Sequence, residues 1–499
     1  MKASGARREV VVIGSGFGGA IAAKRFAEAG YRVTVLELGE DWRDLSKAQQ
    51  SQDPRYLFRL LRNYPHEPLR TKPKLIVTQG MGYGGGSLVY SGIHLRAPAQ
   101  AFEGWPVGWT RARLDPYYAR VEARLGVAEM PDALEFGRPK AFAEGARRAG
   151  LPPARPNPLA MAGCTRCGWC VPLCGFGKKV TMQHTYLRDA ERTGQLTVVV
   201  HRKAAYVGRV GGRYRVFAWR TDGVTQDYHR VAGAELPLER YDADVVVIAG
   251  GAIESPALLE RSLGGVPDGA QPLRAFSIRR LGRELDGTGD FVQGGFVPVR
   301  VDGFKGSVMM AHVDLGDYVL EDLHGVPVGA AVTLGARLPS LTKSWGRAYK
   351  ESFQGYGRHL LAIGIVGKQG AGTGRTMSVH DDGGNAALGD RPYAPAPGAL
   401  EAARSIITAL GGQVVVTPWE LTGAATTVHP TGGCAMGDGA DDVVRASDLQ
   451  VRENPGLYVI DGSVLPGNPL RNPSSTIAAV AERALDVILG VQRPDDWPA

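Results

Sequence analysis

The amino-acid sequence predicts an α/β protein, in which an open parallel sheet flanked by helices is joined to a second domain with a mainly antiparallel sheet. Three observations lead to this fold. An apolar run over residues 9–13 passes directly into a glycine-rich turn and then into a helix-forming segment. Residues 291–428 alternate between polar and apolar and carry no such turn. With 499 residues and 44% hydrophobic content, the chain is too long for one simple core.

The first unit of the chain reads as strand, tight turn, helix and strand. Residues 9–13 are almost continuously apolar, as expected for a buried parallel strand. Residues 20–29 have a helical composition that closes at Gly30, and residues 31–36 are again rich in β-forming side chains. This order predicts a Rossmann-like βαβ unit at the start of the chain.

Three further helices are expected from caps and prolines. One should span residues 111–126, with Pro116 in its first turn. A second should begin with Ser255 as its N-cap and Pro256 at its first position. A long third helix should cover residues 475–489.

The strand pattern divides the chain into two domains. Several strands are expected over residues 196–248, and another over 457–460, after the second domain has ended. The first domain is therefore predicted to be discontinuous. It should comprise residues 1–290 and 429–499, with a cysteine-rich loop inserted at 160–180, and residues 291–428 should form the substrate-binding domain.

Charge and cysteine content narrow the class of protein. The net charge of +8 comes from scattered Lys and Arg, which favours a solvated basic surface over a nucleic-acid site. No apolar stretch approaches the roughly 18 residues of a membrane span. The first apolar run carries the glycine motif, so it is not a removable signal, and a cytoplasmic location is expected. Four of the five cysteines lie within eleven positions, unlike a secreted disulfide framework.

The glycine-rich turn predicts a dinucleotide site. Gly14, Gly16 and Gly19 form G-x-G-x-x-G between a strand and a helix, where they allow a tight turn, backbone approach to a pyrophosphate and close helix packing. The helix N-terminus offers free N–H groups to the phosphates. Glu37 ends the second strand, where a carboxylate can accept hydrogen bonds from the ribose hydroxyls. An acid at this position also argues against a ribose 2′-phosphate, and hence against NADP. This unit alone leaves NAD and FAD open.

Five further blocks resemble the glucose–methanol–choline (GMC) oxidoreductase family, in family order and over nearly the whole chain. Their length and spacing are most similar to the cholesterol oxidase branch. The blocks are Gly-Gly-Gly-Ser-Leu-Val at 84–89, Asp-Val-Val-Val-Ile-Ala-Gly-Gly-Ala-Ile-Glu-Ser-Pro-Ala-Leu-Leu at 244–259, His-Pro-Thr-Gly-Gly-Cys at 429–434, Leu-Tyr-Val-Ile-Asp-Gly-Ser at 457–463 and Asn-Pro-Ser-Ser-Thr-Ile at 472–477.

The resemblance implies a bound FAD and places its contacts. The pyrophosphate would lie at the first glycine turn, the adenosine ribose at Glu37, the flavin beside the second glycine block, and the ribityl chain near the Asp-Gly pair. The implied cofactor contacts are Gly14, Gly16, Phe17, Gly18, Gly19, Glu37, Gly85, Gly86, Ser87, Gly250, Asp461 and Gly462.

The resemblance also implies a catalytic pair, His429 and Asn472, which would hold the substrate hydroxyl while hydride leaves the carbinol carbon. Two positions depart from the cholesterol oxidase pattern. Tyr90 replaces an Asn beside the flavin, and aligning residues 360–363 with the strand of the branch's glutamate base puts Gln354 at that place, with Glu351 nearby. Either His429 acts alone as the base or Glu351 serves, and sterol specificity is in question.

Cys164, Cys167, Cys170 and Cys174 form C-x2-C-x2-C-x3-C, the thiolate spacing of bacterial iron–sulfur proteins, although Gly175 replaces the usual following proline. The favoured prediction is a [4Fe–4S] or [3Fe–4S] cluster. Some GMC-family sugar dehydrogenases carry such a cluster in a corresponding region, which supports it. A zinc site and metal-free cysteines are the alternatives.

These observations predict an FAD-dependent dehydrogenase for a hydrophobic or cyclic alcohol. Its electrons would pass through the cysteine cluster to an acceptor protein or a quinone. One alternative is a cholesterol-oxidase-like enzyme that makes hydrogen peroxide and uses its cysteines structurally. Another is a flavin- or metal-binding protein without alcohol turnover.

Overall fold

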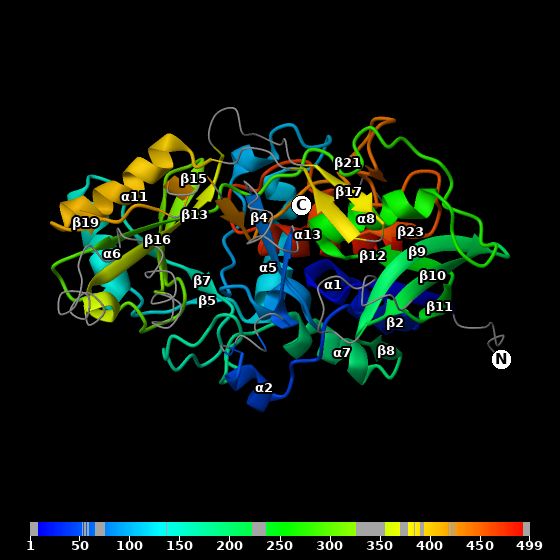
Figure 1. Ribbon diagram of the computed structural model, residues 1–499, viewed down its shortest axis with the longest axis horizontal. Helices are drawn as coiled ribbons and strands as arrows, with labels where there is room; N and C mark the ends of the chain where they lie inside the picture. The colour runs from blue at the N-terminus through cyan, green and yellow to red at the C-terminus, as the bar shows by residue number, and fades with distance from the viewer. Residues whose placement is uncertain are drawn as a thin grey trace.

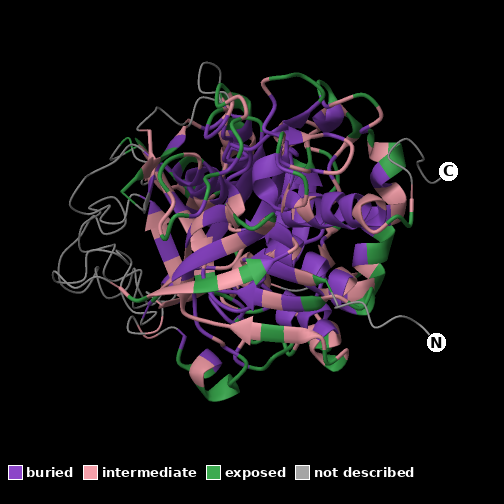
Figure 2. Ribbon diagram, turned by 90° about the vertical axis from the view of Figure 1, so that its right-hand side faces the viewer, coloured by how far each residue is buried: buried purple, intermediate pink, exposed green. Residues whose placement is uncertain are grey.

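The computed structural model places its elements in two groups, which lie side by side in Figure 1. Figure 2 shows buried residues concentrated in the strands and the central helices. No helix in the described part of the chain is long and apolar enough to cross a membrane. The described residues are 8–51, 53, 56, 59–64, 75–135, 137–221, 236–325, 355–369, 378–383, 385–389, 394–417, 419–420, 423 and 425–492.

A five-stranded parallel sheet is the centre of the first group. Its strand order is β23-β12-β1-β2-β8, with Val11 of β1 opposite Val246 on one side and Thr34 on the other. The apolar runs form these strands because both faces of the sheet are covered. The predicted Rossmann-like unit is thus confirmed. Its strands are β1 (Glu9–Ile13), β2 (Arg32–Leu36), β8 (Leu196–Val199), β12 (Val245–Ile248) and β23 (Leu457–Val459).

Helices and a second sheet pack on this parallel sheet. Helix α1 (Phe17–Glu28) contacts β1, α7 (Tyr186–Arg192) and α13 (Ser474–Ile488), and α13 contacts α5 (Arg111–Leu125). A three-stranded antiparallel sheet contacts β1, β2 and β12. Its strands are β9 (Arg202–Val210), β10 (Arg213–Arg220) and β11 (Leu238–Ala243).

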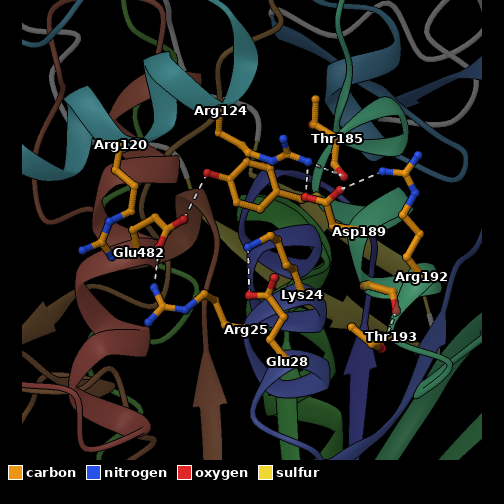
Figure 3. A network of polar contacts seen from close by, with 12 residues as sticks. Lys24, Arg25, Glu28, Arg120, Arg124, Thr185, Asp189, Arg192, Thr193 and Glu482 are labelled. Atoms are coloured by element: carbon orange, nitrogen blue, oxygen red, sulfur yellow. Dashed lines mark hydrogen bonds and ion pairs between the residues drawn. The ribbon is translucent and has the colours of Figure 1, made fainter.

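Polar contacts around Glu482 hold the four helices together (Figure 3). This buried carboxylate of α13 accepts hydrogen bonds from Arg25 of α1 at 2.6 Å, from the Tyr186 hydroxyl of α7 at 3.0 Å and from Arg120 of α5 at 3.2 Å. These donors offset the cost of burying the charge. The network fixes α13 against α1, and Asn472 lies two residues before α13.

The second group is a six-stranded antiparallel sheet of order β19-β13-β16-β15-β14-β6. On one face its apolar side chains, such as Leu320, join a core with Phe142 of α6 and Ala403 of α11. The predicted mainly antiparallel domain is confirmed. Its elements are α6 (Gly137–Arg148), β6 (Arg155–Pro156), β13 (Phe291–Phe296), β14 (Ala311–Asp314), β15 (Tyr318–Leu323), β16 (Leu360–Gly367), α11 (Pro397–Ala409) and β19 (Gln413–Val414).

Helix α6 and strand β6 belong to this second group although they come from the segment before residue 290. The domain limits at 290 and 429 therefore stay a prediction. The other elements are α2 (Leu45–Gln49), β3 (Leu61–Tyr64), β4 (Leu75–Gly80), η1 (Gly85–Leu88), η2 (Ala99–Phe102), β5 (Ala128–Glu129), β7 (Pro158–Leu159), η3 (Met182–His184), α8 (Gly251–Leu263), β17 (Val379–Asp382), β18 (Asn385–Leu388), β20 (Ala425–Thr427), β21 (Met436–Gly437), β22 (Val444–Arg445) and η4 (Gly462–Val464).

One helix start and the place of one proline differ from the sequence prediction. Helix α8 begins at Gly251, so Ser255 is not its N-cap and Pro256 lies inside the helix. Pro116 likewise lies inside α5 rather than in its first turn. Each proline stands at the sixth position, where its missing N–H removes one intrahelical hydrogen bond, and the tertiary packing of both helices outweighs this loss.

The buried ion pair between Arg138 and Asp322 gives a test of this packing. Asp322 lies beneath α6, accepts from Arg138 Nε at 2.7 Å, and also accepts from the N–H groups of Met310 and Ala311. Replacing Asp322 by Asn removes the charge and leaves the buried guanidinium uncompensated. We expect the free energy of unfolding to fall by about 3 kcal/mol in urea titrations. Glu144→Gln, in an exposed ion pair of α6, should leave it unchanged, and equal effects would contradict this account.

Candidate active site

A cavity of about 550 Å³ lies between the two groups of elements and gathers most of the predicted site residues. It is bordered by the glycine turn after β1, the end of β12, the end of β23 and the loop before α13. Gly19 and Ser87 do not line it. The predicted residues that do are Gly14, Gly16, Phe17, Gly18, Glu37, Gly85, Gly86, Gly250, His429, Asp461, Gly462 and Asn472.

Two different physical constraints favour glycine in the first turn. A Cβ on Gly18 would lie 1.8 Å from the carbonyl oxygen of Ile460, and one on Gly19 would lie 2.1 Å from that of Gly14. These positions need glycine because backbones pack together there. A Cβ on Gly16 would meet no atom of the described chain within 4 Å, and the same holds for Gly86. Their bare backbone faces the cavity instead.

Glu37 ends β2 at the cavity wall with both carboxylate oxygens held by the protein. Its Oε2 accepts from the Ser15 N–H at 3.1 Å and the Ser15 hydroxyl at 2.5 Å, and its Oε1 accepts from the Gly39 N–H at 2.9 Å. Burial raises the pKa of Glu37, while the hydrogen bonds from Gly39 and Ser15 act in the opposite direction. Further hydroxyl donors from a ligand would favour its ionised form.

Asp461 ties two segments together at the same end of the parallel sheet. Its Oδ2 accepts from the Gly251 N–H at 2.8 Å and the Ser255 hydroxyl at 2.6 Å. Its Oδ1 accepts from the Ser463 N–H at 2.8 Å. The carboxylate thus fixes the start of α8 against the turn after β23, so that Gly250 and Gly462 border one cavity.

The second glycine block packs directly against the first turn. A Cβ on Gly85 would lie 2.5 Å from the Cα of Gly16, and the Gly84 N–H donates to the Ser15 hydroxyl at 2.9 Å. Ser87 supports the block from within. The Ser87 hydroxyl donates to the carbonyl of Gly84 at 2.6 Å and accepts from the Met182 N–H at 3.0 Å. Tyr90 lines the cavity with its ring edge toward Phe17 at 5.5 Å, and its hydroxyl donates to the Val180 carbonyl. The departure from Asn at position 90 therefore presents an aromatic face, with its polar atom occupied elsewhere.

His429 forms a dyad with a carboxylate that sequence reasoning missed. Its Nδ1 lies 2.7 Å from Oδ1 of Asp290, the residue directly before β13. Asp290 is itself fixed, because its Oδ2 accepts from the Thr427 hydroxyl at 2.7 Å and the Val428 N–H at 3.0 Å. Burial would lower the pKa of His429, but attraction by Asp290 and Glu321 outweighs it and raises that pKa.

Asn472 faces a second missed carboxylate, Glu321 of β15. The Asn472 Nδ2 donates to Glu321 Oε2 at a long 3.4 Å. Burial raises the pKa of Glu321 to about 7. Neither Glu321 Oε1 nor Asn472 Oδ1 has a hydrogen-bond partner within the described part of the chain, and both are buried. Such orphaned polar atoms are costly unless a ligand or water meets them.

The sequence placed the substrate-domain acid elsewhere. Gln354 and Glu351 lie outside the described residues, so the structure does not test that assignment. The sequence signal that could have found this acid lies in β15, where two neighbouring acids, Glu321 and Asp322, interrupt an apolar strand. In the structure both are buried. Adjacent acids in a strand point to opposite faces, and here Asp322 meets α6 while Glu321 meets the cavity side.

Two basic side chains form a cationic part of the cavity wall. Arg62 of β3 and Lys203 of β9 line it and are almost fully buried. Both approach Glu254 of α8, at 3.0 Å and 3.9 Å. Burial lowers the pKa of Lys203 to about 7, with Glu254 pulling in the opposite direction. Two cations around one carboxylate suit the anionic part of a dinucleotide. No local pattern in the sequence predicts this cluster.

The cysteine loop forms part of the cavity wall, through Val171 and Pro172. Lys179 anchors it, donating to the carbonyls of Cys170 at 2.7 Å and Tyr90 at 2.8 Å. Backbone N–H groups donate to three of the sulfurs, those of Cys164, Cys167 and Cys174, at 3.3–3.4 Å.

The iron–sulfur prediction is not confirmed by this geometry. All five cysteines have free thiols. Among the described residues, no three His, Cys, Asp or Glu side chains gather closely enough to hold a metal ion, and this includes Cys164, Cys167, Cys170 and Cys174.

FAD fits the residues around the cavity. The open faces of Gly16 and Gly86 leave room for close backbone approach by a ligand, and the end of the parallel sheet is where dinucleotides bind in such folds. The orphaned oxygens of Glu321 and Asn472 mark a polar spot beside the cavity, which Asn472 lines.

Comparison with known proteins agrees with this arrangement. Models of the GMC oxidoreductase family match residues 9–285 and 399–481. Cholesterol oxidase of Mycobacterium tuberculosis is 27% identical, over 95% of this chain and 90% of that protein. The 2-methyl-1,2-propanediol dehydrogenase of Mycolicibacterium austroafricanum is 25% identical, over 98% and 96%.

A solved structure shares the fold. The crystal structure of pyridoxine 4-oxidase from Mesorbium loti superposes with a TM-score of 0.64 at 19% identity, covering 96% of this chain and 98% of that one. Since the family models span more than half of the sequence, and the fold and the order of the motifs agree with them, the chain belongs to the GMC oxidoreductase family, flavin enzymes that act on CH–OH donors.

Proposed function

We propose that the protein is an FAD-dependent dehydrogenase that oxidises the CH–OH group of a hydrophobic or cyclic alcohol. The observation that carries this proposal is the His429–Asp290 dyad, which borders the same cavity as the glycine turn and Asn472. An imidazole held by a carboxylate is a suitable base for an alcohol proton.

In this proposal the glycine turn holds the pyrophosphate of FAD, and Glu37 accepts the adenosine ribose hydroxyls. Gly85 and Gly86 lie beside the flavin, and Gly250, Asp461 and Gly462 lie along the rest of the cofactor. Arg62 and Lys203 add positive charge near the diphosphate. FAD, when bound, supplies the acceptor for the hydride from the carbinol carbon.

The protein's own residues handle the proton. Because Nδ1 of His429 is engaged by Asp290, Nε2 is the nitrogen left to accept the hydroxyl proton. Asn472, with its free Oδ1, orients the same hydroxyl. Asp290 stabilises the imidazolium that forms, and Glu321 lies close enough to attract the same charge.

The substrate class follows from the remaining lining. Ile93, Val308, Met309 and Leu323 border the cavity, so the body of the substrate would meet apolar surface. Relatives named for cholesterol and for 2-methyl-1,2-propanediol support a neutral alcohol rather than a charged sugar acid.

Replacing Gly16 by Ala tests the cofactor assignment. The added methyl group meets nothing in the folded chain, so the apoprotein should keep its free energy of unfolding within about 0.5 kcal/mol. FAD affinity, measured by flavin fluorescence titration, should fall at least about tenfold, because the methyl group would meet the pyrophosphate. Gly18→Ala should instead destabilise the apoprotein. Unchanged FAD affinity in G16A would remove the pyrophosphate from this turn.

Replacing His429 by Ala tests the catalytic assignment. Bound FAD should remain, while alcohol-driven bleaching of the flavin should slow by about 10²–10⁴-fold. Bleaching at a near-normal rate would show that His429 is not the base. If the wild-type protein binds FAD but no alcohol of a broad panel bleaches it, the alternative of a binding protein without turnover is favoured.

Replacing Asp290 by Asn should move the pH profile in the same experiment. The base must be neutral, so kcat/KM falls as pH drops through its raised pKa. Removing the Asp290 charge lowers the pKa of His429, so the acid limb moves to lower pH while kcat falls. This limb belongs to the coupled His429–Glu321 pair. Asp317→Asn, at an exposed partner of Lys368, should leave the limb in place, and an unmoved limb in D290N would contradict the dyad's role.

We also propose that electrons leave through an iron–sulfur cluster held by Cys164, Cys167, Cys170 and Cys174. The spacing of the cysteines, the N–H donors to three sulfurs and the loop's position at the cavity wall support this route. Binding of the cluster would draw these four sulfurs together around the metal. The alternative is an oxidase in which dioxygen takes the electrons and the cysteines are structural.

Metal analysis separates these routes. Anaerobically purified protein should contain about three or four iron atoms and a similar amount of acid-labile sulfide per chain, with a broad absorbance beside the flavin peaks. Cys167→Ser should lower the iron content while FAD stays bound, and Cys434→Ala, at a buried cysteine remote from the motif, should not. Metal-free protein that releases peroxide with alcohols would establish the oxidase, and zinc would appear in the same measurement.

A further inference from the structure

A polar stripe runs along the face of the antiparallel sheet that is turned away from α6 and α11. His312 of β14 lies directly opposite Glu321 of β15 in the register. Directly opposite residues project to the same face, with Cβ atoms about 5 Å apart. Ala311, Val313 and Leu320 pack against the helices, so His312 and Glu321 point the other way.

The stripe continues to the surface. Asp314 follows His312 by two residues and therefore shares its face. Its side chain is 50% exposed and accepts from Arg471 at 2.7 Å. His312 itself is only 7% exposed. The three groups thus lead from the buried end of the cavity to solvent within two neighbouring strands.

Two atoms of the stripe have unmet hydrogen-bonding capacity. Glu321 Oε1 and His312 Nδ1 are both buried and lack a hydrogen-bond partner among the residues described. Buried polar atoms of this kind are usually met by ordered water. Two such atoms on directly opposed residues are therefore the expected ends of a short water-bridged contact.

The proposed oxidation gives such a contact a role. Each turnover leaves the hydroxyl proton on His429, whose side chain is only 19% exposed, bonds Asp290 and feels the charge of Glu321. That proton has to reach solvent before His429 can act again. We propose that Glu321, His312 and Asp314 form the exit path for the substrate proton, from His429 to the surface. This inference rests on the proposed alcohol oxidation.

The electrostatics of the stripe suit a relay. Glu321, whose pKa burial raises to about 7, can take up and release a proton near neutral pH. It bonds Asn472 and feels the charges of His429 and Asp290, and that of Asp322 from the opposite face of the strand. Burial lowers the pKa of His312 to about 4 despite Asp314, so its ring stays neutral and can accept on one nitrogen while donating from the other.

The charged groups around His312 are Asp314 of its own strand, Arg155 of β6 and Arg471 of the loop before α13. The two arginines disfavour a resident charge on the ring. A proton is therefore passed on toward Asp314 rather than stored on His312.

The test uses ferricyanide, a one-electron acceptor that takes up no proton. Oxidising one alcohol with two ferricyanide ions yields one carbonyl product, two ferrocyanide ions and two protons. The proton taken by His429 is one of these and must leave through the protein. In FAD-loaded His312→Gln, steady-state turnover should fall about tenfold. The first flavin bleaching by alcohol, followed in a stopped-flow instrument without acceptor, should stay near the wild-type rate.

Two readouts separate a relay from a structural role. The solvent deuterium isotope effect on turnover should increase in H312Q, and added imidazole should restore turnover without changing the bleaching rate. Asp314→Asn, at the exposed outlet, should give the same pattern with a smaller loss and guards against misfolding of H312Q. His380→Gln, the same exchange at an exposed histidine of β17, should change none of these values.

If H312Q keeps the turnover rate and the solvent isotope effect of the wild-type protein, the relay is overturned while the proposed function stays intact. Bleaching that slows as much as turnover would also overturn it, because His312 would then act on the chemical step or on the fold. If wild-type protein is not bleached by any alcohol, the proposed function fails and the relay with it.

Discussion

The close approach of three backbone segments at the carboxyl end of the parallel sheet is the constraint on which the rest of the molecule depends. The turn after β1 lies against Ala249 at the end of β12 and against Ile460 at the end of β23, at distances that leave no space for side chains at Gly14 and Gly18. This contact brings residues more than 200 positions apart to one cavity. Asp461 then fixes the turn after β23 to the start of α8, because it accepts hydrogen bonds from the N–H groups of Gly251 and of Ser463 in its own turn.

Much of this frame was predictable because its signals are local. Apolar runs, glycines at turns and the order of five motifs predicted β1, α1, β2, β12 and β23. The same motifs pointed to His429 and Asn472. The start of α8 was missed because two glycines and tertiary packing allow a helix to begin before Pro256. Asp290 and Glu321 were missed because their roles arise from side-chain contacts with loop residues that are distant in sequence, which periodicity does not reveal.

The catalytic groups come from both halves of the molecule. His429 and Asn472 lie on loops beside the parallel sheet, whereas Asp290 and Glu321 lie on the antiparallel sheet. The loops beside the parallel sheet thus present His429 and Asn472 to the acids of the antiparallel half. The electrostatic environment of the base is therefore set by how the two sheets meet, and small changes in that interface alter its affinity for a proton.

Neighbouring acids in β15 link folding to chemistry. Asp322 anchors α6 on one face, while Glu321 faces Asn472 on the other. A strand exposes alternate side chains to alternate faces, so slipping β15 by a single residue would exchange their surroundings. An uncompensated carboxylate would then lie beneath α6, and the guanidinium of Arg138 would lose its counter-ion. The turn between β14 and β15 can consequently lengthen by two residues with far less harm than by one, and the parity of that loop is a trait on which selection can act.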